Sequence, residues 1–242
     1  MNTLSVHIAT KRYPNGSCAI QGMAFDARPG EFVAIVGPSG AGKTTLLKII
    51  SGLDTDFDGT VQTGSEARIG FMFQEPRLMP WLTVAQNLAL VDPSATGHRL
   101  TEALERVGLK DCEALFPKQL SGGMQRRVAL LRAFLMAPQL LLMDEPFESL
   151  DAPTAEQLRE QLLTLWQDSR PTVLFVTHNL QEALSLADRV LFLTPGPTRI
   201  ALDFAVELPR PRGLDAAAVQ GLAQELIQAH PDLLKGRLER SS

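Results

Sequence analysis

The chain has 242 residues, 45% of them hydrophobic, and carries a formal net charge of 23 − 27 = −4 at pH 7. This size and composition fit one domain, or a core domain with an added lobe, and exclude a largely disordered chain. A mildly acidic chain is a poor candidate for wrapping nucleic-acid backbones, so no nucleic-acid partner is expected.

Short apolar runs alternate along the chain with segments of helical periodicity. Such runs are typical of strands buried on both faces of a sheet, and the alternation predicts an α/β fold with a largely parallel sheet. The expected strands are 31–37, 139–144, 172–178 and 189–194. The expected helices are 43–52, 124–137, 153–169 and 180–188.

Residues 76–120 interrupt this alternation with helix-like segments around a Gly/Ser/Thr-rich turn, which predicts a helical insertion. The expected boundaries are 1–75 and 138–205 for the sheet core, 76–137 for the helical subdomain and 206–242 for a helical tail. Four apolar residues of the tail recur at helical spacing, so we expect the tail to pack on the sheet. They are Val219, Leu222, Leu226 and Ile227.

No window contains 18 uninterrupted apolar residues, so the chain is not expected to span a membrane by itself. Residues 1–17 lack the apolar segment of a signal peptide. Cys18 and Cys112 lie far apart without a partnering histidine, which favours free thiols in a reducing compartment over a disulfide or a metal site.

The sequence GPSGAGKTT at 37–45 lies between an expected strand and an expected helix. It matches G-x-x-x-x-G-K-[ST], in which glycines let backbone N–H groups converge on phosphate oxygens at a helix start. Lys43 is expected to neutralise the β- and γ-phosphates, and Thr44 to bind Mg²⁺. The alternative is a chance glycine-rich turn, and the strand–loop–helix context argues against it.

Three further polar residues follow apolar strands, at the edge where open α/β sheets bind ligands. Asp144 ends the run LLLMD and is expected to hold Mg²⁺, while Glu145 could polarise an attacking water. His178 ends the run VLFVTH and could contact a γ-phosphate. Taken alone, an Asp-Glu pair is often a solvated strand end and a lone histidine is usually structural.

Four features occur in a fixed order: the phosphate loop, Gln74 in FMFQEP, LSGG at 120–123 followed by LLLMDEP, and VTHN at 176–179. Together they resemble the ATP-binding subunits of ABC transporters, over about Val6 to Phe204. The resemblance implies a RecA-like P-loop NTPase core with a mostly parallel sheet, a small antiparallel β region and an inserted α-helical subdomain. P-loop kinases and GTPases do not share LSGG before an Asp-Glu strand end.

The resemblance implies a role for each matching residue, with ATP and Mg²⁺ as cofactors. Tyr13 corresponds to an aromatic that stacks on adenine, and Gln74 to a residue that contacts the metal or the attacking water. Residues implied in nucleotide binding are Tyr13, Gly37, Pro38, Ser39, Gly40, Ala41, Gly42, Lys43, Thr44, Thr45, Ser121, Gly122, Gly123 and Asp151. Those implied in catalysis are Glu145, His178 and Gln74, and those implied in metal binding are Thr44, Gln74 and Asp144.

One chain thus contains two phosphate-binding motifs, the loop at 37–45 and the signature at 120–123. In the family two ATP-binding subunits close head to tail, and each ATP lies between the loop of one and the signature of the other. The resemblance therefore implies a homodimer. Sequence spacing alone leaves open that the signature folds back near the phosphate loop of its own chain.

Residues 73–88 carry a compact apolar group beside prolines: Leu78, Met79, Trp81 and Leu82. This group is either the core of the helical subdomain or a groove for a cytoplasmic helix of a membrane protein, and both can hold. The resemblance implies an integral membrane permease docking near 74–88 and, indirectly, a periplasmic or extracellular solute-binding protein. It places the chain peripherally on the cytoplasmic face of the inner membrane.

The compact length, FESLDAPT and LPRPR resemble importers of the nitrate, sulfonate and taurine type, so a small organic or inorganic anion is the expected solute. An importer for a thiamine precursor is the alternative. A soluble ABC-type ATPase acting on nucleic acid or ribosomes is a further alternative, and the single cassette without a coiled-coil insertion argues against it.

Four positions depart from the pattern of the resembled family. Arg126 stands where a glutamine is usual, Leu131 replaces a small alanine, Glu148 replaces a glycine or alanine, and Asn179 replaces an aspartate. None of these departures removes an expected catalytic group. The segment 43–74 is also short, which predicts a trimmed antiparallel region.

Overall fold

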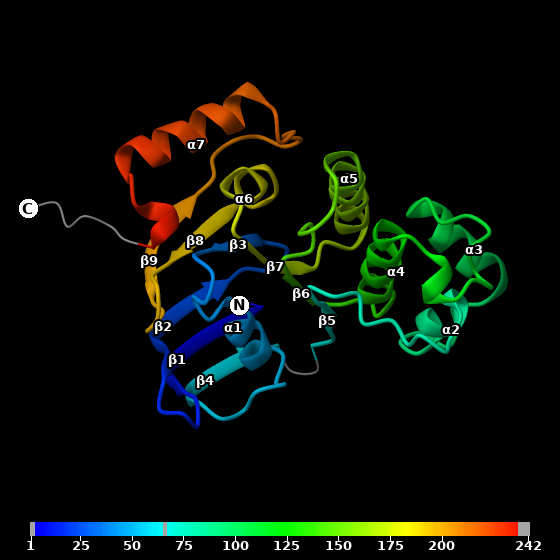
Figure 1. Cartoon of the computed structure of the whole chain (residues 1–242), viewed down its shortest axis with the longest axis horizontal. Coiled ribbons are helices and arrows are strands. Elements are labelled where there is room, and N and C mark those ends of the chain that lie inside the picture. Colours follow the sequence, from blue (N-terminus) through cyan, green and yellow to red (C-terminus); the bar gives the residue numbers. More distant parts are fainter. Residues whose placement is uncertain (1–2, 65–66, 237–242) are drawn as a thin grey trace, which may run out of the picture. The chain divides into compact units, whose positions relative to one another are not determined.

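The computed structural model describes residues 3–64 and 67–236, and the chain forms two compact units. The first unit comprises residues 1–66 and 172–242, and the second comprises residues 67–171 (Figure 1). Within the described residues, no helix is long and apolar enough to cross a membrane.

The first unit contains a three-stranded antiparallel sheet in the order β2-β1-β4. Its strands are β1 (Leu4–Arg12), β2 (Cys18–Ala27) and β4 (Asp58–Thr63). Along β1, buried and more exposed side chains alternate until the pairing with β4 becomes irregular between Ile8 and Thr10. Such an irregularity shifts the alternation by one residue, and it places the charged Lys11 on the buried side.

The other strands of the first unit lie in the order β7-β3-β8-β9. Parallel pairing joins β3 (Phe32–Val36) to β7 (Thr172–Thr177) and to β8 (Arg189–Leu193), and β9 (Ile200–Ala205) runs antiparallel to β8. Every residue of β3 and β7 is buried, and Phe32 meets Phe175 edge to face with ring centroids 6.3 Å apart. The predicted class, α/β with a mostly parallel sheet and a small antiparallel sheet, is confirmed.

Helix α1 (Lys43–Ile50) follows β3, and α6 (Leu180–Leu186) follows β7. The C-terminal helix α7 (Ala217–Ala229) packs against α6 through a face that includes Val219 and Leu226, and a short 3₁₀ helix η2 (Leu233–Lys235) follows it (Figure 1). Ile227, which the periodicity assigned to the packed face, is 43% exposed. Residues 237–242 of the predicted tail lie outside the described residues.

In the second unit, β5 (Ile69–Met72) pairs in parallel with β6 (Leu140–Asp144). The helices are α2 (Val84–Ala89), α3 (Gly97–Arg106), η1 (Pro117–Gln119), α4 (Gly122–Leu135) and α5 (Ala152–Ser169). Helix α4 packs on β5 so closely that a Cβ on Gly70 would lie 2.7 Å from the carbonyl oxygen of Ala133. Glycine at position 70 is therefore required by the packing rather than by a turn.

Candidate active site

The predicted phosphate loop connects β3 to α1 in the first unit. Gly40 and Gly42 have φ values of +77° and +68°, which L side chains rarely adopt. Gly37 lies in a tight place of a different kind, because a Cβ there would lie 3.0 Å from the Cβ of Leu193. The local geometry of 37–45 is thus the strand–loop–helix arrangement that the sequence predicts.

Lys43 begins α1, and its side chain folds back over the loop. Its Nζ donates to the carbonyl oxygens of Gly37 at 2.8 Å and Pro38 at 3.1 Å. Gly42 precedes the helix without a side-chain cap, so the first-turn N–H groups receive no capping side chain. An N-terminus of this kind, with an ammonium group beside it, favours an anion.

Tyr13 is joined to this loop within the same unit. Its hydroxyl lies 2.5 Å from Oγ1 of the buried Thr45, while 39% of the residue remains exposed. Thr44, the predicted metal ligand, is exposed. The Tyr13 ring and the phosphate loop are therefore neighbours. A nucleotide could place its base on the ring only if its phosphates can reach the loop, and this arrangement meets that condition.

Lys11 is a residue near this ring that sequence analysis missed. Its Nζ lies 5.4 Å from the centroid of the Tyr13 ring and donates to Asp54 Oδ1 at 2.8 Å and to the Asp56 carbonyl at 2.6 Å. Burial alone would lower the pKa of Lys11, but its bonds to Asp54 and Asp56 outweigh burial and raise it. A lysine on the buried face of an alternating strand would have indicated a buried charge in the sequence. The irregularity in β1 shifts the alternation before Lys11, so the sequence pattern does not show this.

His178 is exposed and directly follows β7. The following residue, Asn179, caps α6 by accepting from the N–H groups of Gln181 at 2.9 Å and Glu182 at 3.3 Å. The Thr177 hydroxyl donates to the Glu182 carboxylate at 2.7 Å. Asparagine thus serves here as a helix cap, a position where asparagine and aspartate are similarly favoured.

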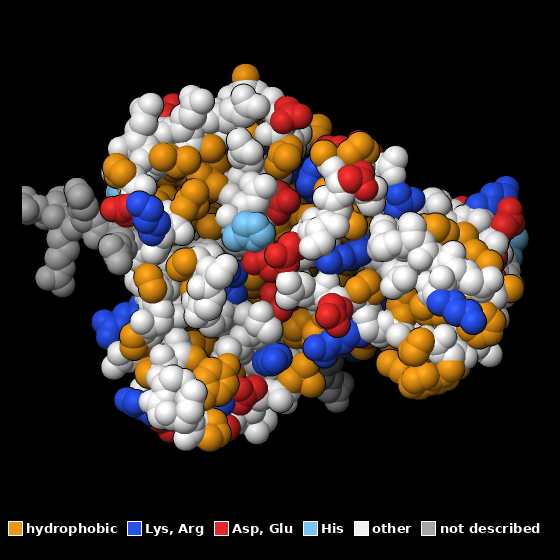
Figure 2. Space-filling view, viewed as in Figure 1, with side chains coloured by type: hydrophobic (Ala, Val, Ile, Leu, Met, Phe, Trp, Pro, Cys, Tyr) orange, Lys and Arg blue, Asp and Glu red, His pale blue; other side chains and the backbone are white. Residues whose placement is uncertain are grey.

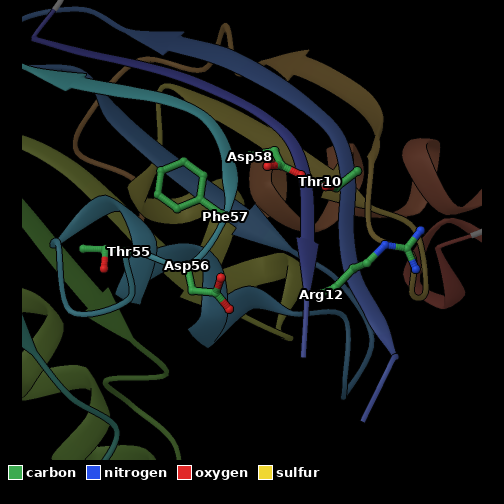
Figure 3. A pocket seen from close by; sticks show the side chains of 6 residues that line it. All are labelled: Thr10, Arg12, Thr55, Asp56, Phe57 and Asp58. Carbon is green, nitrogen blue, oxygen red and sulfur yellow. Dashed lines mark hydrogen bonds between the residues drawn. The ribbon is translucent and has the colours of Figure 1, made fainter. Parts of the chain in front are cut away.

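A pocket of about 210 Å³ lies beside the antiparallel sheet of the first unit and contains none of the predicted site residues. Figure 3 shows Thr10 beside Asp58, whereas Arg12 extends away from them. The hydroxyl of Thr10 donates to Asp58 at 2.6 Å. The remaining lining residues are Thr55, Asp56 and Phe57. With two carboxylates and one arginine in its lining, this pocket is unsuited to a polyphosphate.

In the second unit, β6 ends at Asp144, the first of the two predicted carboxylates. Asp144 is 3% exposed, and Glu145 follows it with a backbone φ of 46°. A positive φ on a residue with a side chain is costly and is retained where the surrounding structure enforces it, often at functional sites. The turn redirects the chain immediately after the buried strand, so Glu145 is less buried than Asp144.

Gln74 follows β5 and donates from its side-chain amide to the carboxylate of Glu148. Glu148 itself lies three residues beyond Glu145. Within the second unit, Gln74 therefore contacts the loop that directly follows Glu145.

The signature residues lie at the start of α4. Ser121 caps this helix, with its Oγ accepting from the N–H of Met124 at 3.2 Å, and Gly122 begins it. A Cβ on Gly123 would lie 2.5 Å from Cγ2 of Thr154. Gly123 thus adjoins the start of α5, where Asp151 is the cap.

Asp151 accepts from the N–H of Thr154 at 3.0 Å and from its hydroxyl at 2.8 Å. These bonds lower the pKa of Asp151. The signature and Asp151 are thus held by adjoining helix starts.

The predicted residues divide between the units as follows. The first unit contains Tyr13, Gly37 to Thr45 and His178, and the second contains Gln74, Ser121 to Gly123, Asp144, Glu145 and Asp151. Across residues 3–64 and 67–236, no three His, Cys, Asp or Glu side chains gather closely enough to hold a metal ion.

The α/β fold with its phosphate loop defines a P-loop NTPase. The family model described as "ABC transporter" matches residues 20–148, and the chain belongs to that family as an ATP-hydrolysing subunit. The chain is 45% identical over 228 residues to aliphatic sulfonates import ATP-binding protein SsuB 1 of Pseudomonas aeruginosa, covering 87% of this chain and 92% of that protein. It is 40% identical over 239 residues to SsuB of Bacillus licheniformis, covering 93% of each.

Solved structures of ATP-binding cassettes have the same fold. The dimeric post-hydrolysis state of the cassette MJ0796, bound to ADP and Pi, is similar with a TM-score of 0.73 and 31% identity, over 85% of this chain and 100% of that one. The fold of cbiO1 from Clostridium perfringens is similar with a TM-score of 0.75, over 96% of this chain and 97% of that one, at 22% identity.

Proposed function

We propose that this chain hydrolyses ATP to drive an importer of small anions of the aliphatic sulfonate type. The proposal rests on one observation above all: relatives named as aliphatic sulfonate import ATP-binding proteins match nearly the whole chain at 40–45% identity. An ATP-binding subunit does not touch the solute, so the proposed solute comes from these relatives and not from a pocket of this chain.

Within the first unit, Tyr13 is proposed to stack on the adenine and residues 37–45 to surround the phosphates. The observed bond between Tyr13 and Thr45 supports this, because it links the ring to the loop. Lys43 already lies across the loop, and a phosphate would compete with the two carbonyls for its ammonium group. His178 is proposed to contact the γ-phosphate.

The proposed Mg²⁺ ligands are Thr44, Gln74 and Asp144. These side chains supply hydroxyl, amide and carboxylate oxygens, which are the donors that Mg²⁺ prefers, and Asp144 is nearly fully buried at a strand end. When bound, Mg²⁺ would neutralise charge on the phosphates.

Glu145 is proposed as the general base that accepts a proton from the attacking water. Its position directly after a buried strand, on a strained turn, holds the carboxylate group at a fixed place. As water attacks the γ-phosphorus, the bond to the β-γ bridging oxygen breaks, and ADP leaves. Lys43 offsets the negative charge that develops on that oxygen.

A second copy of the chain is proposed to supply Ser121, Gly122, Gly123 and Asp151 to each nucleotide. Their location on capped helix starts gives them N–H groups and a hydroxyl suited to an anion. The similar cassette MJ0796 has been solved as a dimer, which supports this arrangement. ATP would then favour closure, and hydrolysis would favour reopening.

The permease is proposed to dock on residues 74–88, at the cytoplasmic face of the membrane, with a solute-binding protein acting on the permease from the other side. Trp81 is 70% exposed, whereas Asn87 is fully buried and ties this segment together through bonds to Met79, Leu82 and Thr83. Hydrophobic side chains also gather on the surface over α2 (Figure 2). A rigid segment with an exposed aromatic side chain is a typical protein-binding feature.

The decisive experiment reconstitutes the chain with a permease and a solute-binding protein of the aliphatic sulfonate importer type, and measures ATP hydrolysis with different solutes. We expect alkanesulfonates to stimulate hydrolysis more than nitrate or a thiamine precursor. Glu145→Gln should lower turnover about 10²- to 10⁴-fold while leaving ATP binding intact. Stimulation by a thiamine precursor alone would refute the proposed solute, and near-normal turnover in Glu145→Gln would refute the proposed base.

The dimer is tested separately on the isolated chain. Lys43→Ala should abolish ATP binding, whereas Ser121→Arg should abolish hydrolysis and leave binding to the monomer nearly unchanged. If Ser121→Arg weakens monomer binding as strongly as Lys43→Ala, both motifs serve one nucleotide and the proposed dimer is wrong.

A further inference from the structure

Arg126 and Glu148, two of the departures from the family pattern, meet within the second unit. Arg126 lies in the second turn of α4 and is only 8% exposed. Its Nη2 donates to the carbonyl oxygen of Glu148 at 2.9 Å, and its Nη1 donates to that of Pro146 at 3.1 Å and that of Glu145 at 3.4 Å. One guanidinium group thus contacts the main chain at three of four consecutive residues.

The loop that Arg126 contacts is strained. Glu145 has a φ of 46° and Ser149 a φ of 63°, both in the left-handed region. Within the loop, the N–H of Glu148 donates to the carbonyl oxygen of Glu145 at 3.1 Å, and that of Leu150 donates to the carbonyl oxygen of Phe147 at 3.4 Å. A charged donor that contacts several carbonyls is well suited to hold such a conformation, because bonds from charged groups are the stronger ones.

The same loop also reaches Gln74. The Glu148 carboxylate accepts from the Gln74 amide, and this contact depends on where the main chain places Glu148. Burial lowers the pKa of Arg126 and the nearby Glu148 opposes that effect. The guanidinium group, the loop and the glutamine therefore form one connected set.

We infer that Arg126 is a positioning residue, which fixes the main chain from Glu145 to Glu148 and through it the Glu145 carboxylate and the Gln74 amide. This rests on the proposed function for the roles of Glu145 and Gln74. Because α4 begins with the signature residues, Arg126 also connects this helix directly to the loop from Glu145 to Glu148 of the same chain. A glutamine at this position has one amide group and can donate two bonds, so it would hold fewer carbonyls.

The test compares Arg126→Met with Arg126→Gln and with Arg127→Met. Arg127 is the matched control, because it is adjacent on α4 and its guanidinium bonds to Gln157, away from the loop. Three quantities are measured on the full chain: hydrogen exchange of a peptide spanning 144–151, the Kd for ATP without Mg²⁺, and kcat for hydrolysis.

In Arg126→Met, exchange of that peptide should be at least about fivefold faster, because the loop loses the three bonds that Arg126 donates. The kcat should fall about tenfold to a hundredfold, because the Glu145 carboxylate would be displaced from its productive position. The Kd for ATP should stay within about twofold of the wild-type value. Arg126→Gln should recover part of both effects, and Arg127→Met should show neither.

Unchanged exchange in Arg126→Met, a kcat within about twofold of wild type, or a Kd that worsens in step with kcat would each overturn the inference. A wild-type chain that does not hydrolyse ATP would instead refute the proposed function. The exchange measurement would then still decide whether Arg126 holds the loop.

Discussion

Replacing Lys11 by methionine should weaken the binding of ATP through its base and not through its phosphates. Lys11 lies against the Tyr13 ring and is held there by two carboxylate residues. If adenine stacks on Tyr13, the Lys11 ammonium group helps to fix the ring that receives it. Methionine keeps the length of the side chain but has no charge to attract the ring or the carboxylates.

The expected changes in the Kd for ATP and in the free energy of unfolding follow from how exposed Tyr13, Asp54 and Asp56 are. A cation–π contact at a partly exposed ring contributes about 0.5–1 kcal/mol, which corresponds to a rise in Kd for ATP of about two- to fivefold. Breaking a fully buried ion pair costs about 3–5 kcal/mol. The Asp54 and Asp56 side chains are 20% and 86% exposed and can regain water, so we expect a smaller loss of unfolding free energy, about 1–2 kcal/mol.

The assay measures the Kd of the nucleotide-free chain for ATP and for inorganic tripolyphosphate, which has no base to stack. Lys11→Met should raise the Kd for ATP and leave that for tripolyphosphate unchanged. Arg12→Met is the matched control. Arg12 is the next residue in the chain, its side chain is exposed to solvent, and the replacement removes the same charge. It should change neither value.

The reasoning is refuted if Lys11→Met raises both Kd values equally, since the effect would then come from general charge or from distortion of the phosphate loop. It is also refuted if Lys11→Met still weakens ATP binding when Tyr13 has been replaced by alanine. A normal Kd for ATP would show that the ring does not depend on Lys11.

Three further outcomes are expected. Burial raises the pKa of the Cys112 thiol, so at pH 8 a disulfide reagent should label the half-buried Cys18 first, and equal rates would contradict the structure. Acrylamide should quench Trp81, 70% exposed, and spare Trp166, 1% exposed; loss of all quenching in Trp81→Phe checks the assignment. Hydrogen bonds lower the pKa of Asp151 in the folded chain. Their stabilising effect is fully present above the unfolded-state pKa, near 3.9, and is lost as pH falls through the lower folded-state pKa. The Tm deficit of Asp151→Ala should therefore be present at pH 6 and shrink below about pH 3, and a deficit independent of pH would contradict this.

Sequence patterns predicted those elements whose signals are local. The apolar run at 31–37 became β3 because every residue of a strand between two others in a parallel sheet is buried. The signal of the phosphate loop was also largely local, since Gly40 and Gly42 are needed for positive φ values in their own turn, whereas Gly37 contacts the distant Leu193. Helix α4 begins two residues earlier than expected, at Gly122, because Ser121 caps it and makes glycines acceptable in the first turn.

The contacts that sequence patterns could not predict join residues far apart in the chain. Lys11 reaches Asp54 and Asp56 only because β1 and β4 pair with an irregularity near Thr10, and no periodicity in either strand specifies that shift. A regular register would have placed the charge on the exposed face. Register irregularities depend on tertiary pairing, so the partner of a buried charge is found in a structure and not in a pattern.

Arg126 illustrates a different limit. The sequence marks it as unusual and gives no partner, because the three carbonyl groups that it contacts belong to main chain that any sequence possesses. A departure from a family pattern can therefore be compensated by backbone groups that leave no trace in residue identities. In this chain Arg126 bonds to backbone carbonyls of the loop that contains Glu145. The same loop contains Glu148, the second departure, and the Glu148 side chain accepts a hydrogen bond from Gln74. Arg126 therefore bears on the contact between Glu148 and Gln74 through the main chain, and Arg126→Gln should disturb that contact.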